Sequence, residues 1–227
     1  MRFAYLALVV FAATTPLLAQ DKSPTNKFEG EIKAYEAADK KSPPPENAIL
    51  FVGASGIRLW KTLEKDFPEH RVINRGFGGS QIADAIYFTD RIVIPYKPRI
   101  ILLQSGGNDI NAGKTPQQVA EDFHVFVEKV RAKLPEVRIL FMSLQPSPAR
   151  WSQADQQKQA NSLIKKQIET GKNMAYIDAF DAFLTADGKP REELFLADKL
   201  HHNEAGYKIR VDLVRPFLKS DGDSKGK

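Results

Sequence analysis

Two hydrophobic patterns meet in the stretch Ile49-Leu50-Phe51-Val52-Gly53-Ala54-Ser55-Gly56-Ile57-Arg58-Leu59-Trp60. Its first four residues form a short apolar run, which is typical of a buried parallel strand. After Gly53 the apolar residues recur at the spacing of a helix, at Ile57, Trp60, Leu63 and Phe67. Ser55 therefore stands where a strand ends and a helix begins. In open α/β folds this edge of the sheet binds ligands, although a serine there can also be only a helix N-cap.

The alternation of strand and helix patterns continues along the chain. Apolar runs predict further strands at 71–74, 99–104, 137–142 and 175–178. Helices are predicted at 28–38, 82–94, 115–134, 155–169 and 203–218. This alternation is typical of a parallel sheet covered by helices on both faces, and right-handed crossovers leave few topologies for it. The sequence therefore predicts a single α/β domain.

The two ends of the chain differ in composition from this domain. Residues 1–19 combine Arg2, a short apolar core and a final Ala19, which is the pattern of a cleaved signal peptide. The apolar core is too short for a membrane span. Residues 20–47 form an N-terminal segment with a proline-rich connector, residues 48–218 the domain, and residues 219–227 a tail predicted to be disordered. We expect a secreted or periplasmic protein that has no membrane insertion once the signal is cleaved.

The composition excludes several classes of function. The chain has 227 residues and no cysteine, which rules out disulfides, thiol nucleophiles and thiolate metal sites. Its net charge of +5 is spread along the chain, so we expect no nucleic-acid partner. The first turn lacks the glycine spacing of a dinucleotide site, and no phosphate-loop lysine is present. No histidine and carboxylate cluster has the spacing of metal ligands, and we expect neither metal nor cofactor. The oligomeric state stays open.

Polar residues follow the predicted strands at four points. Ser55 follows the first strand, the segment 74–80 the second and the segment 105–109 the third, while the segment 198–203 precedes the last helix. Because the carboxyl ends of parallel strands share one edge of the sheet, these four segments should meet.

The chemistry that this set permits is acyl transfer. A serine hydroxyl becomes a useful nucleophile when a histidine takes its proton and a carboxylate orients the imidazole. Asp198 and His201 are three residues apart, so one turn can bring both to the same side, whereas the adjacent His202 is a competing candidate for the base. The N–H of Ser55, an N–H from the glycines of 76–79 and the amide of Asn108 could bind the oxyanion.

Each feature also has an ordinary structural explanation. Glycines at 76–79 can form only a turn, Asn108 can cap a helix, and a histidine before a helix can be a packing residue. The combination in this chain order, at the ends of successive strands, is far more specific than any single feature.

Here the sequence resembles the SGNH hydrolases, also called GDSL-type esterases and lipases. Four blocks carry the resemblance, which extends from about residue 48 to 218: Gly53-Ala54-Ser55, Asn74 to Gly79, Gly106-Gly107-Asn108-Asp109 and Asp198-Lys199-Leu200-His201. The resemblance implies a flavodoxin-like, three-layer α/β/α sandwich with a five-stranded parallel sheet. It also implies Ser55 as nucleophile, His201 as base and Asp198 as its orienting acid. The implied oxyanion hole consists of the Ser55 N–H, the Gly79 N–H, with Gly78 as an alternative, and the Asn108 side chain.

The chain departs from the family at Ala54, where the family usually has aspartate. That aspartate is not the acid of the triad, so the implied mechanism does not depend on it. Candidates for the substrate-binding cleft are Trp60, Arg75, Phe77, Trp151 and Phe195. The resemblance and the predicted export together favour a secreted serine esterase for short acyl groups, such as acetyl groups on glycans. The alternatives are a non-catalytic glycan-binding domain on the same fold and an acyltransferase with the same triad.

Overall fold

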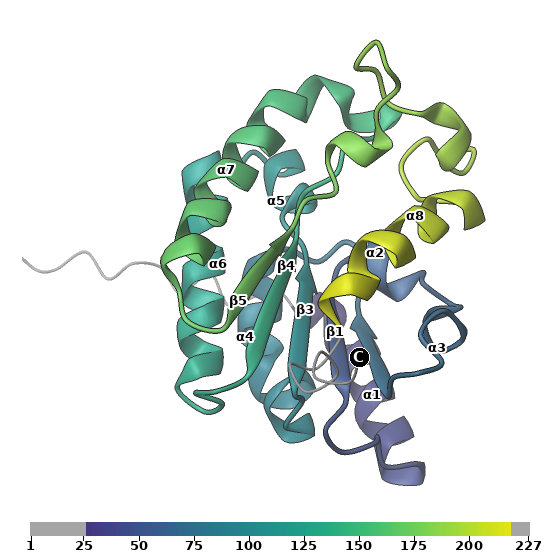
Figure 1. Cartoon of the computed structure of the whole chain (residues 1–227). Coiled ribbons are helices and arrows are strands. Elements are labelled where there is room, and N and C mark those ends of the chain that lie inside the picture. Colours follow the sequence, from purple (N-terminus) through teal and green to yellow (C-terminus); the bar gives the residue numbers. More distant parts are fainter. Residues whose placement is uncertain (1–25, 219–227) are drawn as a thin grey trace, which may run out of the picture.

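A five-stranded parallel sheet forms the centre of the molecule (Figure 1). The computed structural model describes residues 26–218, so the predicted signal peptide and the predicted disordered tail lie outside the described residues. The strands lie in the order β2-β1-β3-β4-β5. Their bounds are β1 Ile49–Gly53, β2 Val72–Gly76, β3 Ile100–Gln104, β4 Arg138–Met142 and β5 Met174–Ile177. The predicted parallel sheet is confirmed.

The strand order creates a switch point beside β1. From β1 the chain moves outward to β2, and it then returns to β3 on the opposite side of β1. Gly53 at the end of β1 is aligned with Gly76 of β2 and with Gln104 of β3. In doubly wound folds, ligands bind outside the carboxyl ends of the strands at such a point. Ser55 follows directly after it.

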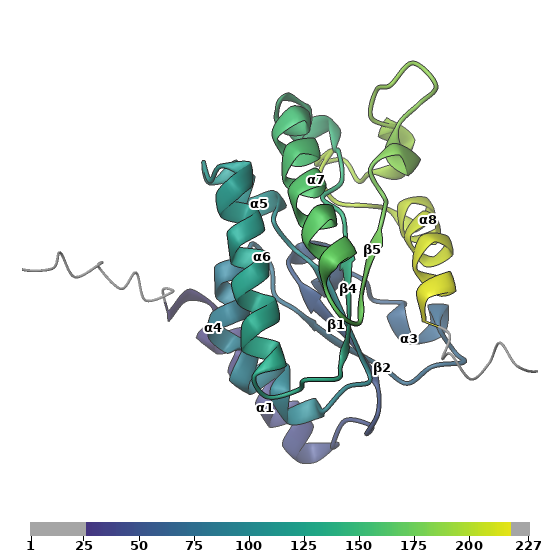
Figure 2. The ribbon, with the colours of Figure 1, turned by 60° about the vertical axis from the view of Figure 1, so that its left-hand side comes forward.

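Helices cover both faces of the sheet, which confirms the three-layer sandwich (Figure 2). Leu50 and Val52 of β1 point into one core, whereas Ile49 and Phe51 point into the other, as the alternation of side chains along a strand requires. The first face is covered by α1 Glu29–Lys41, α4 Ile82–Ile92, α6 Pro116–Arg131 and α7 Ala154–Thr170. The second is covered by α2 Ser55–Arg58, α3 Leu63–Asp66 and α8 Glu204–Val214.

Short helical turns complete the structure at the ends of the main elements. The helix α5 Gly107–Asn111 follows β3 directly. The 3₁₀ turns are η1 Asn26–Phe28, η2 Ile94–Tyr96, η3 Pro148–Gln153, η4 Asp181–Phe183, η5 Glu192–Leu194 and η6 Arg215–Phe217. Of these, η3 matters most for the site because it lies in the connection that leaves the carboxyl end of β4.

The helical pattern after β1 does not form one helix. It is divided into α2 and α3, and Trp60 lies between them. Asp66 holds the interruption in place, since its carboxylate accepts hydrogen bonds from the Trp60 indole at 2.6 Å and from the Thr62 hydroxyl at 2.7 Å. The apolar residues of the pattern nevertheless pack into one core with Phe51. The spacing therefore predicted correctly which side chains are buried, but the prediction of one continuous helix was wrong.

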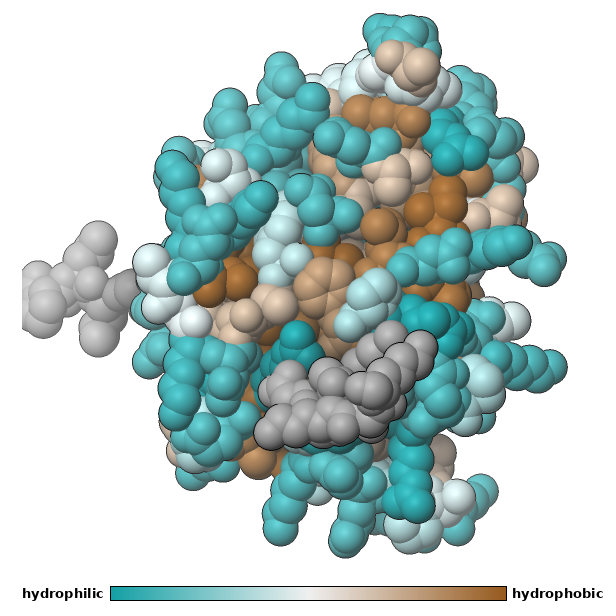
Figure 3. Space-filling model, in the orientation of Figure 1, coloured by the Kyte–Doolittle hydropathy of each residue, from teal (hydrophilic) through white to brown (hydrophobic). Residues whose placement is uncertain are grey.

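The edge strand β5 is only half-buried at Met174, Ala175 and Tyr176. On the face of the molecule that Figure 1 shows, apolar surface is visible among hydrophilic side chains (Figure 3). Within residues 26–218, no helix is both long enough and apolar enough to cross a membrane.

Candidate active site

Ser55 lies at the start of α2, directly after the turn that leaves β1. This turn requires a glycine at position 53, the last residue of the strand. Gly53 has a φ of 150°, and a Cβ there would lie 2.0 Å from the backbone oxygen of Gln104 in β3. Ala54 is the N-cap residue and supplies no side-chain hydrogen bond. The interpretation of Ser55 as the N-cap is therefore wrong, and its hydroxyl is available for other contacts.

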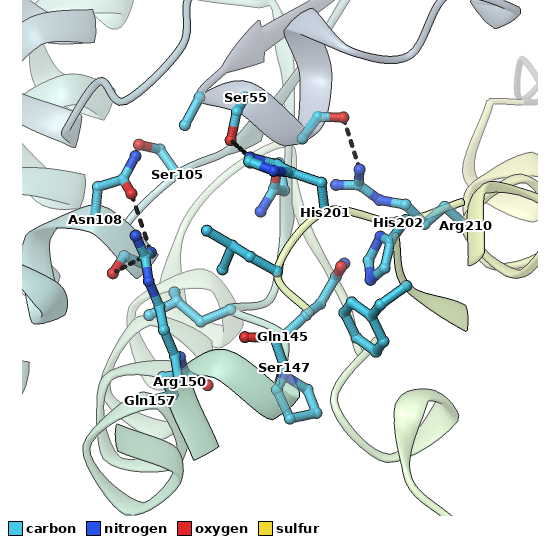
Figure 4. Close-up of a pocket in the computed structure, with 18 residues that line it drawn as sticks. Ser55, Ser105, Asn108, Gln145, Ser147, Arg150, Gln157, His201, His202 and Arg210 are labelled. Carbon is cyan, nitrogen blue, oxygen red and sulfur yellow. Dashed lines mark hydrogen bonds between the residues drawn. The ribbon is translucent and has the colours of Figure 1, made fainter. Parts of the chain in front are cut away.

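The hydroxyl of Ser55 contacts the ring of His201 (Figure 4). The distance from Ser55 Oγ to His201 Nε2 is 2.9 Å, and His201 Nδ1 lies 2.6 Å from Asp198 Oδ2. Because the carboxylate accepts at Nδ1, the proton of a neutral ring lies on that nitrogen and Nε2 is an acceptor. Three side chains from the two ends of the domain thus form one continuous chain of hydrogen bonds.

A tight turn brings Asp198 and His201 together. Lys199 has a φ of 55°, and the second carboxylate oxygen of Asp198 accepts the backbone N–H groups of Leu200 at 2.9 Å and His201 at 3.0 Å. The backbone and ring hydrogen bonds from His201, together with that of Leu200, lower the pKa of Asp198 to about 2. The carboxylate is therefore ionised at neutral pH, and since 47% of its side chain is exposed, burial does little to oppose the charge.

His202 lies in a different environment from its neighbour. Its ring stacks on Phe183 at a centroid distance of 4.4 Å and also contacts Phe195 at 4.8 Å. Burial lowers the pKa of His202 well below its usual value, and the charges of Arg210 and His201 act in the same direction. The ring is therefore a neutral packing group, and it has no hydrogen bond to Ser55.

Asn108 lies in the first turn of α5, after Gly106 with its φ of 114°. Its Nδ2 donates to the backbone oxygen of Ser80 at 2.9 Å, and its Oδ1 accepts from Nη1 of Arg150 at 3.0 Å. The side chain of Asn108 thus links the loop after β2 to the η3 turn after β4. Sequence reasoning missed Arg150, since no motif marks the η3 segment.

Asp109, the next residue, connects α5 to the start of α4. It is fully buried and accepts the backbone N–H of Ile82, at 3.2 Å and 3.3 Å to its two oxygens, and the ammonium of Lys114 at 2.8 Å. Burial raises the pKa of Asp109, and the hydrogen bond and charge of Lys114 oppose this. The carboxylate therefore ties the start of α4 to α5, next to Asn108.

The glycine loop after β2 is held by α1 and α2. Asn74 Nδ2 donates to the backbone oxygen of Ile57 at 2.7 Å. The N–H of Gly78 donates to Glu31 at 3.3 Å, whereas Gly79 is exposed and has a φ of 80°. Gly79 is not among the residues that line the cavity beside Ser55.

Ser55, Asn108 and His201 border one cavity of about 90 Å³ (Figure 4). Its lining combines polar and apolar groups and contains no carboxylate. Besides the three residues above, the lining includes Ser105, Leu144, Gln145, Ser147, Arg150, Gln157, Phe195, His202 and Arg210. The cavity thus brings the Ser55 and His201 pair together with the amide of Asn108, and Arg150 and Arg210 contribute guanidinium groups to its lining.

Of the five residues predicted to line the cleft, Phe195 does so and Trp151 does not. The prediction is also wrong for Trp60. Its side chain is 1% exposed and packs against Phe51 and the guanidinium of Arg210, and its indole N–H donates to the part-buried Asp66.

Arg75 and Phe77 are further corrections, since α1 covers Arg75, while η1 and α4 cover Phe77. The guanidinium of Arg75 lies between the rings of Tyr35 and Tyr96, and it pairs with Asp39 of α1. Phe77 is fully buried and packs edge-to-face against Phe28 and Phe88. Both residues stabilise the loop after β2 and do not line the cavity. Within residues 26–218, no group of three or more histidine, aspartate or glutamate side chains is arranged to hold a metal ion.

Comparisons with known proteins identify the family of this chain. The model of the GDSL-like lipase/acylhydrolase family matches residues 52–209. The human platelet-activating factor acetylhydrolase IB subunit alpha1 is 25% identical over 183 residues, which cover 75% of this chain and 74% of that protein. The bovine alpha2 subunit is 24% identical over 227 residues, covering 94% of each chain.

Solved structures share the fold at lower identity. A GDSL-like lipase from Bacteroides thetaiotaomicron has a TM-score of 0.70 and 18% identity, covering 82% of this chain and 96% of that one. A mutant acetyl-xylooligosaccharide esterase from Geobacillus has a TM-score of 0.62 and 17% identity, covering 78% and 96%. These likenesses establish the α/β fold.

Proposed function

Because the chain belongs to the GDSL-like lipase and acylhydrolase family, whose members are hydrolases that act on esters, we propose that it is an exported serine esterase for short acyl groups. In this proposal Ser55 is the nucleophile, His201 the general base and Asp198 the residue that orients the base. The observation that carries the proposal is the unbroken hydrogen-bond chain from Ser55 Oγ through the His201 ring to Asp198.

The reaction follows from that chain of hydrogen bonds. His201 Nε2 takes the proton of the Ser55 hydroxyl as Oγ attacks the ester carbonyl, and the imidazolium that forms is stabilised by the ionised Asp198. The same nitrogen then gives the proton to the departing alcohol, leaving an acyl group on Ser55. Water attacks this acyl-enzyme with His201 again as base, and Ser55 is regenerated with release of the acid.

The negative charge of the tetrahedral intermediate needs donors, and three are proposed. The N–H of Ser55 belongs to the first turn of α2, where no helical carbonyl can accept it. Asn108 borders the cavity, and one of its amide hydrogens has no partner in the part of the chain that the structure describes. For the third donor we favour Gly79, since the N–H of Gly78 is engaged by Glu31.

The size of the cavity favours a small acyl group. Its volume of about 90 Å³ is well below the roughly 300–1,000 Å³ of pockets that enclose drug-sized ligands. Two of the similar proteins are named for acetyl esters, one as an acetylhydrolase and one as an acetyl-xylooligosaccharide esterase. We therefore propose acetyl esters as the preferred substrates.

The lining favours a polar alcohol as the other part of the ester. Gln145, Ser147 and Gln157 offer hydrogen-bonding groups, and Phe195 offers an aromatic ring at the same cavity. Hydroxyl groups of a glycan match these donors and acceptors better than a fatty chain does. Acetylated glycans are accordingly the proposed natural class.

Rates on p-nitrophenyl esters of increasing acyl length test this proposal. The acetate should be the best substrate, and kcat/KM should fall by roughly tenfold or more at the octanoate, because added methylenes do not fit the cavity. Ser55→Ala should abolish turnover, whereas Ser162→Ala, on the exposed side of α7, should keep it. An octanoate preference would contradict the short-acyl assignment, and an active Ser55→Ala protein would contradict the nucleophile.

Acetate release from an acetylated oligosaccharide tests the glycan assignment separately. We expect faster release from it than from an acetylated lipid of equal concentration, with Ser55→Ala inactive on both. The reverse order would contradict the glycan class while leaving the esterase intact.

Export is the remaining part of the proposal. It is supported by the basic start, apolar core and small residue of segment 1–19. The intact mass of protein recovered outside the cytoplasm should correspond to a chain that starts at Gln20. Recovery of the full chain with residues 1–19 attached would contradict it.

A further inference from the structure

The amide of Asn108 is held from both ends. Arg150 Nη1 donates to its Oδ1 at 3.0 Å, and its Nδ2 donates to the backbone oxygen of Ser80 at 2.9 Å. A guanidinium can only donate and a backbone oxygen can only accept, so these two partners determine which end of the amide faces which neighbour. Without Arg150, only the bond to Ser80 would oppose rotation of the amide away from the oxyanion position.

Among residues 26–218, no carboxylate forms an ion pair with Arg150. Its only hydrogen-bond partners among the described residues are Asn108 and the backbone oxygen of Gly107 at 3.3 Å. Arg75 and Arg91, by contrast, pair with Asp39 and Glu36. Buried Arg210 resembles Arg150 in this respect, since it donates to the backbone oxygen of Gly56 at 2.7 Å. Burial lowers the pKa of Arg150, but a guanidinium stays protonated in proteins. Its full charge therefore acts on the amide to which it donates.

The backbone of η3 aims this side chain at Asn108. Arg150 has a φ of −125° and a ψ of 26°, which break the helical turn at this residue. The preceding Ala149 donates its N–H to the backbone oxygen of Lys199 at 3.0 Å, within the turn that carries Asp198 and His201. One short segment thus contacts both the turn of the proposed base and the side chain of the proposed oxyanion donor.

We propose that Arg150 is a positioning residue for the esterase reaction, acting through Asn108. It fixes the orientation of the amide, and its charge polarises the amide so that Nδ2 becomes a stronger donor to the oxyanion. The benefit appears mainly in the transition state, because only there does the substrate oxygen carry the charge that Nδ2 binds. This inference rests on the proposed function, and specifically on Asn108 as an oxyanion donor.

The test is a set of Arg150 variants assayed on p-nitrophenyl acetate. Arg150→Gln should lower kcat by roughly 10- to 100-fold, less than the loss of a direct donor, with a smaller change in KM. Arg150→Lys, which keeps the charge without the planar fork, should recover part of the rate. The matched control is Arg131→Gln, since Arg131 also donates to backbone carbonyls but lies far from the cavity, at the end of α6. A wild-type kcat in Arg150→Gln overturns the proposal.

A double-mutant cycle with Asn108→Ala separates positioning from other roles. If Arg150 acts through Asn108, Arg150→Gln should change kcat less than about twofold in the Asn108→Ala background. Equal effects in both backgrounds, or an effect confined to KM, would mean that Arg150 contacts the substrate itself, and would overturn the proposal. If Arg150→Gln does not fold by circular dichroism, the same cycle with Arg150→Lys gives the same decision.

The cycle also distinguishes the failure of this inference from failure of the proposed function. Inactive Ser55→Ala and impaired Asn108→Ala proteins beside a normal Arg150→Gln protein would reject only the role of Arg150. An active Ser55→Ala protein would reject the serine-esterase mechanism, and the role of Arg150 with it.

Discussion

His201 and His202 are adjacent in the chain and lie in opposite environments. The ring of His201 is part-exposed at the edge of the cavity and lies between Ser55 and Asp198. The ring of His202 is packed on Phe183 and has its pKa lowered by burial. Successive residues of one turn point to different sides, so a side chain one position away cannot take the same role. The comparison shows that the contacts of its ring with Asp198 and Ser55 distinguish the candidate base from the adjacent histidine.

The largest expected effect separates these two histidines. His201→Ala should lower kcat/KM by roughly 10⁴- to 10⁶-fold, as loss of the base does in serine hydrolases. His202→Phe should keep the rate within about tenfold, because phenylalanine preserves the ring stacked on Phe183. Both proteins are compared on p-nitrophenyl acetate after their folding is checked by circular dichroism. If His202→Phe is inactive and His201→Ala is active, the base has been assigned to the wrong residue.

The second largest loss of activity is expected from a change at Asp198, the hydrogen-bond partner of His201. Asp198→Asn should lower kcat by roughly 10³- to 10⁴-fold, because the amide no longer favours the tautomer with its proton on Nδ1. The fold should be retained, since the side chain is about half exposed. Asp181→Asn, outside the cavity, is the control for a charge change at a turn. A kcat within about threefold of wild type would show that the carboxylate does not orient the base.

A smaller loss of activity is expected from a change at Asn108, the proposed donor to the substrate oxygen. Asn108→Ala should lower kcat by roughly 10²- to 10³-fold with less effect on KM, since its donor acts mainly in the transition state. The acid limb of the pH–rate profile should keep its midpoint, because the variant leaves His201 and Asp198 in place. A loss expressed only in KM would make Asn108 a ground-state binding residue.

The smallest effect is on stability, and it comes from His202. A histidine whose pKa is lower in the folded protein binds protons less readily than in the unfolded chain. Wild-type stability should therefore be full above the usual value of 6.5 and should fall as the pH drops below it. His202→Phe should lose less unfolding free energy between pH 8 and pH 5, measured by urea titration at both values. An equal loss in both proteins would show that His202 is not buried as a neutral ring.

Much of the fold could be predicted because it depends on local patterns. The apolar runs and the helical spacing between them give the strands and the main helices, and the parallel topology brings Ser55, Asn108 and His201 to one edge. The polar segments after the strands therefore allowed the location of the candidate site to be predicted from the sequence.

The lining of the cavity could not be predicted in the same way. Residue type does not distinguish a packing aromatic from a binding aromatic. The burial of Phe77 depends on η1 and that of Arg75 on α1, and the sequence pattern does not specify how this N-terminal segment docks. Arg150 was missed because η3 is a short irregular turn without periodicity. Its role depends on a contact with Asn108, 42 residues earlier in the chain.

The central claim is that Ser55 is the nucleophile activated by His201, and an organophosphate label tests it most directly. After incubation with a fluorophosphonate, peptide mass spectrometry should find one adduct, on Ser55, and the protein should lose its esterase activity in proportion to labelling. His201→Ala should label far more slowly, whereas His202→Phe should label at nearly the wild-type rate. Labelling of another residue, or inactivation without an adduct on Ser55, would contradict the account.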